Sequence, residues 1–163
     1  MVAAEPDNFR LLCEDLLRSG RGVRFRATGT SMHPAIRDGE LVTVEPVDAS
    51  AVRRGDVVLF RSARGLTAHR VTRVVARPDA SQYFVLRGDN TGESHEHVAT
   101  TSVLGCVIGV ERGGRVFNPG AAWVRATVAV RALLRRLKVC AVDLVARGTE
   151  GLLHEFRWRP DGG

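Results

Sequence analysis

The order of apolar and polar residues divides the chain into a short helix, a β-rich middle and a second helix. Apolar residues recur at helical spacing within residues 7–19, where Asp7 can cap the helix and Gly20 can end it. From residue 23 to residue 117 the pattern changes to short runs rich in Val, Leu, Ile and Phe, separated by turn residues. The predicted strands are 23–28, 40–47, 56–61, 66–77, 83–87 and 102–112.

Short strands at this spacing predict a mainly β fold, a small coiled β-barrel or sandwich with an N-terminal helix. Beyond Asn118-Pro119-Gly120, residues 121–147 predict one amphipathic helix, apolar on one side and rich in arginine on the remaining arc. We therefore expect an N-terminal helix in 1–22, a β domain in 23–117, and a basic helix and tail in 118–163.

Composition narrows the class of protein. The chain has 163 residues, is 44% hydrophobic and carries a net charge of +6. No aromatic-rich basic motif accompanies that charge, so we expect no nucleic-acid partner. Three widely spaced cysteines form no CxxC pair and indicate a reducing compartment. We expect no secretory signal, because charged residues interrupt the N-terminus before an apolar stretch develops. The longest uncharged stretch, residues 98–110, falls short of the ~20 residues of a membrane span.

Three short motifs in the β region each contain one side chain suited to acyl-transfer chemistry. Ser31 is a potential nucleophile, His69 a potential base and Asp89 a potential acidic partner. The motifs are Gly29-Thr30-Ser31-Met32-His33-Pro34, Ala68-His69-Arg70-Val71 and Arg87-Gly88-Asp89-Asn90. The only lysine is Lys138, far beyond them, so a base for Ser31 within this region has to be a histidine.

Each of these residues also has a purely structural interpretation. Ser31 and Asp89 both suit turns, because short polar side chains bond to their own backbone. His69 alone in an alternating strand suits a core or surface position. The pair His95 and His97 falls short of the three or four ligands of a structural metal site, so we expect no metal and no cofactor.

Four sequence elements resemble the signal peptidase I superfamily, whose clan also contains the LexA-type self-cleaving repressors. They are Ser-Met-x-Pro at 31–34, residues 36–42, residues 54–58 and Gly-Asp-Asn at 88–90. The resemblance covers about residues 23–112. Most bacterial members pair serine with lysine, whereas His-Arg-Val at 69–71 is typical of the archaeal and endoplasmic-reticulum type. The resemblance implies that Ser31 is the nucleophile, His69 the general base and Asp89 the acidic partner.

The sequence departs from the family pattern at several positions around the predicted site. Members often carry a serine, which helps to bind the oxyanion, at the position of Gly29; Thr30 is a possible substitute, and Met32 completes the substrate and oxyanion region. Backbone N–H groups of the Gly29–Ser31 turn are further candidate donors. Histidine-type members carry a second acid after Gly-Asp-Asn, for which Glu93 and Glu96 are candidates. We expect the chain to lack the membrane anchor that is usual in the family.

The function predicted is a serine endopeptidase that cleaves a precursor peptide or protein, bound extended along a strand edge, with a small residue before the cleaved bond. Two alternatives stay open: a catalytically silent relative that binds a peptide as a scaffold, and a self-cleaving LexA-like regulator. The 121–147 helix either packs on the β core or a second chain, or lies on an anionic membrane. We expect a cytoplasmic protein, with peripheral attachment to the membrane as the alternative.

Overall fold

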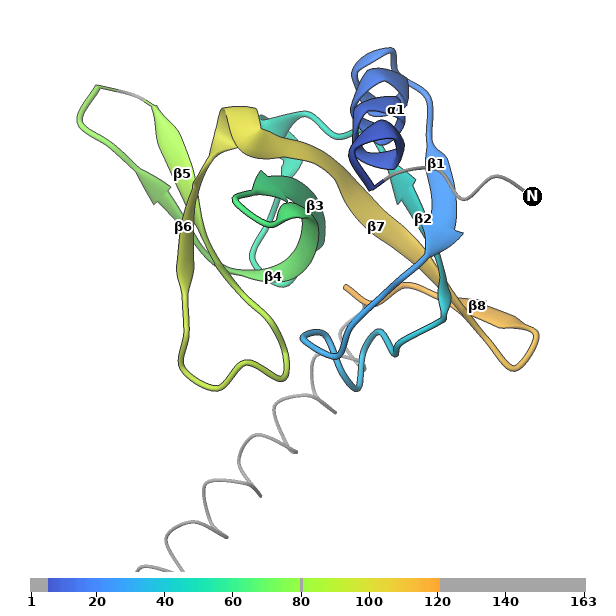
Figure 1. Ribbon diagram of the computed structural model, residues 1–163. Coiled ribbons are helices and arrows are strands. Elements are labelled where there is room, and N and C mark those ends of the chain that lie inside the picture. Colours follow the sequence, from blue (N-terminus) through green and yellow to red (C-terminus); the bar gives the residue numbers. More distant parts are fainter. Residues whose placement is uncertain (1–5, 80, 121–163) are drawn as a thin grey trace, which may run out of the picture. The chain divides into compact units, whose positions relative to one another are not determined.

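The computed structural model describes residues 6–79 and 81–120, which form one helix and a curled antiparallel sheet (Figure 1). The helix is α1 (Pro6–Arg18). The strands are β1 (Val23–Arg26), β2 (Leu41–Glu45), β3 (Val57–Ser62), β4 (Gly65–Ala76), β5 (Gln82–Arg87), β6 (Glu96–Ala99), β7 (Val103–Arg112) and β8 (Arg115–Phe117). Two short 3₁₀ turns, Ala49–Ala51 and Thr100–Ser102, lie between strands. The mainly β class predicted from the sequence is confirmed.

Helix α1 begins at Pro6, so Asp7 lies within its first turn and does not precede it as expected. Proline suits this first position because its missing N–H would have no partner there. At the other end, the N–H groups of Gly20 and Arg21 donate to the carbonyls of Leu17 and Leu16. Gly20 has a φ of 79°, which a glycine adopts readily, so it ends the helix as the sequence predicted.

The strands run in the order β1-β2-β7-β3-β4-β5-β6, with β8 added beside β7. All pairs are antiparallel. Two strands were not predicted. Strand β6 begins with Glu96 and His97, which break the apolar pattern, and β8 has only three residues after the turn at Gly113-Gly114.

The core consists of two clusters that share β3. Val57 and Leu59 belong to the first cluster, while Val58 and Phe60 belong to the second. A strand buried on both faces has a continuous apolar run instead of an alternation, as the Val-Val-Leu-Phe sequence of β3 does. The first cluster also includes Met32 and Ile36. The segment after Ser31 is therefore packed into the core.

The predicted helix 121–147 and the tail after it lie outside the described residues, so its packing and membrane interpretations stay predictions. Within residues 6–79 and 81–120, no helix is long and apolar enough to cross a membrane.

Candidate active site

Ser31 stands at the start of a tight turn that precedes β2. Gly29 has a φ of 91°, in the left-handed region that favours glycine, and its N–H donates to Asp38 Oδ1 at 2.7 Å. The Ile36 N–H donates to the Met32 carbonyl at 2.9 Å, and the His33–Pro34 peptide bond is cis. Met32 is only 5% exposed, so its side chain anchors the turn while Ser31 stays partly accessible.

Arg112, at the end of β7, holds the far side of the same turn. Its guanidinium donates to the carbonyls of Pro34 and Ala35, at 3.1 and 3.3 Å, and forms a two-contact ion pair with Glu40. Burial favours the neutral form of Glu40, yet the hydrogen bonds from Arg112 and from the Arg37 N–H lower its pKa. Glu40 therefore stays ionised, and one arginine connects the turn to the end of β7.

His69 lies in the middle of β4, opposite Val58 of β3. It is 6% exposed, and its ring lies 5.8 Å from the Phe60 ring, centroid to centroid. Burial lowers the pKa of His69 below its ordinary value of 6.5, while the charges of Glu96 and Asp89 act in the opposite direction. The imidazole is therefore neutral at pH 7, which is the form that accepts a proton.

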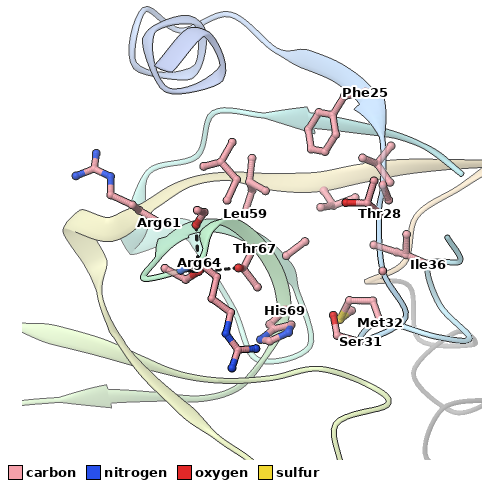
Figure 2. A pocket seen from close by; sticks show the side chains of 18 of the residues that line it. Phe25, Thr28, Ser31, Met32, Ile36, Leu59, Arg61, Arg64, Thr67 and His69 are labelled. Carbon is pink, nitrogen blue, oxygen red and sulfur yellow. Dashed lines mark hydrogen bonds between the residues drawn. The ribbon is translucent and has the colours of Figure 1, made fainter. Parts of the chain in front are cut away.

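Gly88 lies close to both the Ser31 backbone and the His69 ring. A Cβ at this position would lie 2.7 Å from the Ser31 carbonyl oxygen and 3.1 Å from His69 Nε2, so only glycine allows this approach. The next residues fix the contact: the Asn90 N–H donates to the Ser31 carbonyl at 2.7 Å, and Asn90 Nδ2 donates to the Thr30 carbonyl at 3.2 Å. Figure 2 shows Ser31 and His69 beside each other on the wall of one cleft.

We expect Gly88→Ala to lower peptide hydrolysis about a hundredfold while the protein stays folded. The added methyl group forces apart the Ser31 backbone and the His69 ring, and a displacement near 1 Å at reacting groups costs about that factor. Gly22→Ala is the matched control, because its Cβ meets the Val44 carbonyl at 3.2 Å, away from the cleft. Rates and circular dichroism of both variants check this. Equal activity of Gly88→Ala and Gly22→Ala would show that the approach at Gly88 is unimportant.

The carboxylate nearest to His69 belongs to Glu96. Its Oε1 lies 3.0 Å from His69 Nδ1, but the direction of the contact is not that of a hydrogen bond, so this buried Nδ1 has no hydrogen-bond partner here. The carboxylate is therefore close enough to stabilise the imidazolium that forms when His69 accepts a proton. Catalytic contacts are often poorly aligned before substrate binds, and a small rotation of either group would complete this one. Of the two second-acid candidates, Glu96 is the one that reaches His69.

Asp89, the expected acidic partner of His69, is instead bound to Arg70. The Arg70 Nε and Nη2 donate to the two carboxylate oxygens of Asp89 at 2.8 and 2.7 Å. Arg70 Nη1 also donates to the carbonyls of Gly55 and Pro119, at 2.8 and 3.0 Å. The side chains of Asp89 and Arg70 are 3% and 10% exposed. Asp89 thus acts on His69 through its charge, and its hydrogen bonds hold the Gly88–Asn90 loop.

The other expected site residues have different surroundings. Gly29 and Met32 line the cleft. The N–H of Gly29 is bonded to Asp38, which removes it from the candidate oxyanion donors. Thr30 is exposed and not part of the cleft wall, so it does not replace the family's serine.

The cleft has a volume of about 1440 Å³ and runs from Ser31 and His69 toward α1. Its apolar floor consists of core or core-packed residues: Phe25, Ala27, Met32, Ile36, Val42, Leu59, Leu66, Ala68 and Val107. One wall is β1, which among the described strands pairs only with β2. The other is the first half of β4, where residues 65–69 pair with β3, while pairing with β5 starts at Arg70. Within residues 6–79 and 81–120, two strand edges without a neighbouring strand therefore face the cleft.

Comparison with known proteins identifies the family of this chain. The sequence model of the Peptidase S24-like family matches residues 2–108. This range contains Ser31, His69, Asp89 and Glu96 together with both walls of the cleft. No curated protein matches the chain. The match spans more than half of the sequence, so the chain belongs to the Peptidase S24-like family, in the clan of the LexA-type repressors and the signal peptidases.

Proposed function

We propose that this protein is a serine endopeptidase of signal-peptidase type, in which Ser31 is the nucleophile and His69 the general base. The observation that carries the proposal is that the Ser31 backbone and Nε2 of a neutral histidine both lie close to Gly88. The cleft supports it further, because an extended peptide can pair with the free edges of β1 and β4.

The reaction follows from the two side chains. His69 Nε2 accepts the hydroxyl proton while Ser31 Oγ attacks the peptide carbonyl carbon, giving a tetrahedral intermediate. His69 then returns the proton to the leaving nitrogen, the C–N bond breaks, and an acyl-enzyme remains. Water, deprotonated by His69, releases the acid and restores Ser31. Because the Gly29 N–H is bonded to Asp38, we propose that the N–H of Ser31 itself donates the hydrogen bond that stabilises the oxyanion.

In this mechanism Glu96 is the positioning residue for the base. Its carboxylate beside Nδ1 favours the tautomer with the proton on Nδ1, which leaves a lone pair on Nε2 to accept the Ser31 hydroxyl proton. Asp89 is paired with Arg70, and its negative charge favours the protonated form of His69. Its hydrogen bonds also keep the loop that contains Gly88 in place.

The substrate proposed is a precursor peptide or protein bound in extended form. Ala27 and Ala68 line the cleft close in sequence to Ser31 and His69, and the floor around them is apolar. Such walls favour uncharged residues next to the cleaved bond. Association with a membrane through 121–147, in an otherwise cytoplasmic protein, is part of the proposal that only the full chain can test.

Digestion of a diverse peptide library tests the activity. We expect wild-type protein to cut a defined subset of peptides and Ser31→Ala to cut none, as read by mass spectrometry with and without anionic vesicles. Ser31→Ala removes only the nucleophile from a partly exposed turn, so its fold should be unchanged. Cleavage by both proteins would assign the activity to another group. Peptide binding by both, with cleavage by neither, would favour the silent scaffold.

Self-cleavage is the second candidate, because the family matched here belongs to the clan of the LexA-type repressors. The intact mass of wild-type protein, followed during prolonged incubation alone, separates the two activities. A constant mass together with library cleavage supports a peptidase that acts on other chains. A Ser31-dependent loss of mass supports the self-cleaving regulator.

A further inference from the structure

The wall of the cleft carries an excess of positive charge. Four arginines line it, and among the described residues of this wall the only acid is Glu96, which lies beside His69. The arginines are Arg10, Arg26, Arg61 and Arg64. They come from α1, β1 and the β3–β4 hairpin, so different segments of the sequence contribute the same charge to one surface.

Two of these arginines are already paired with a carboxylate. Glu14 of α1 is 5% exposed and accepts hydrogen bonds from Arg61, at 3.1 and 2.7 Å, and from Arg10, at 3.1 Å. Burial favours the neutral acid, but the hydrogen bonds from Arg61 and Arg10 lower the pKa of Glu14. This ionised carboxylate attaches α1 to the hairpin and occupies Arg61, which in Figure 2 points away from the cleft.

Arg64 is different. It stands at the tip of the β3–β4 hairpin and is exposed, and within residues 6–79 and 81–120 its guanidinium has no carboxylate partner. The Ser62 hydroxyl accepts the Arg64 N–H at 3.1 Å and contacts the Thr67 hydroxyl at 2.8 Å, which fixes the backbone of the tip. Figure 2 shows the Arg64 side chain extending back along the cleft wall on the side of His69.

We propose, building on the peptidase function above, that the substrate carries an acidic side chain that Arg64 binds as the peptide lies along β4. A guanidinium binds a carboxylate through two parallel hydrogen bonds, which an amide or an alkyl side chain does not provide. At ~3.3 Å per residue of extended chain, the distance from His69 to the hairpin tip corresponds to about three to five substrate residues. The acidic residue is therefore expected about three to five positions from the cleaved bond.

A peptide explains this arrangement better than an anionic membrane. The arginine lines the same concave cleft as Ser31 and His69, between two strand edges that bind an extended chain. A membrane surface would instead require a protruding face with apolar and basic residues, and here the apolar residues form the floor of the cleft.

A charge-swap experiment tests the proposal. In a peptide library, one position at a time is fixed as Glu, Gln or Lys, and cleavage is measured for wild type, Arg64→Glu and the control Arg73→Glu, an exposed arginine outside the cleft wall. We expect wild type and Arg73→Glu to prefer Glu over Lys about tenfold at one position, and Arg64→Glu to prefer Lys there. Equal preferences in all three proteins would overturn the proposal while the peptidase function stands.

Binding provides a second readout that does not depend on turnover. The same peptides are titrated into Ser31→Ala and into Ser31→Ala/Arg64→Glu, at low and at high salt, and into both with phosphatidylglycerol vesicles present. Tighter binding of Glu peptides to the Ser31→Ala protein, lost with Arg64→Glu and weakened by salt, supports the proposal even if no peptide is cut. Vesicle binding that depends on Arg64, with no preference among peptides, overturns it in favour of a membrane contact.

Discussion

His69→Ala is expected to lower kcat/KM for peptide hydrolysis by about a thousandfold or more, the loss typical when the base of a serine nucleophile is removed. Ser31 would keep its hydroxyl and its turn but lose the acceptor for its proton. His95→Ala is the matched control, because His95 is exposed on the neighbouring loop and outside the cleft wall. Initial rates on one library-derived peptide measure both variants. Activity of His69→Ala within tenfold of wild type would remove His69 from the mechanism.

The same histidine sets the pH dependence. Burial lowers its folded-state pKa below 6.5, so the reactive neutral form predominates at pH 7. In wild type, kcat/KM should therefore rise with pH through an inflection below 6.5 and stay level from there to about pH 8. An inflection well above 6.5 would indicate a different base or a protonated histidine in the resting site.

Arg70→Met is expected to destabilise the protein by about 3–5 kcal/mol, because it leaves the Asp89 carboxylate buried without its counter-charge. Four hydrogen bonds from Arg70 are lost together, two to Asp89 and two to backbone carbonyls. Urea unfolding followed by circular dichroism measures the change. The variant should lose activity in parallel, since Asp89 lies in the loop that holds Ser31 through Asn90.

The double variant Arg70→Met/Asp89→Asn separates the ion pair from simple packing. Removing both charges eliminates the unpaired carboxylate, so the double variant should be more stable than Arg70→Met alone. If Arg70→Met costs less than about 1 kcal/mol, or if the double variant is the weaker of the two, the pair has no stabilising role.

Much of the fold follows directly from the pattern of residues. Strands β3, β4 and β7 are rich in apolar residues, and their positions agree with the predicted 56–61, 66–77 and 102–112 to within about one residue. The helix was also predicted, because its apolar spacing and Gly20 are local signals. Strand β6 was missed because Glu96 and His97 have no periodicity, and it forms by pairing with β5, a non-local contact.

The candidate site could be predicted only in part, because local motifs can be read from the sequence and tertiary contacts cannot. Ser31 and His69 stand in short motifs that can be read from the sequence, whereas the partners of the charged residues depend on tertiary structure. Adjacent strand residues point to opposite faces, so Arg70 lies on the face of β4 opposite to His69 and binds Asp89 there. That left Glu96 as the carboxylate beside His69. The roles of Gly88 and Arg112 appear only when segments distant in sequence are packed together.

Covalent labelling of Ser31 tests the central claim most directly. A small fluorophosphonate, which phosphonylates activated serines and releases fluoride, is incubated with wild type, Ser31→Ala, His69→Ala and His95→Ala, and the adducts are located by peptide mass mapping. The account predicts one adduct, on Ser31, in wild type and in His95→Ala, and none in the other two proteins. An unmodified Ser31 in wild type, or equal labelling without His69, would contradict a serine nucleophile activated by this histidine.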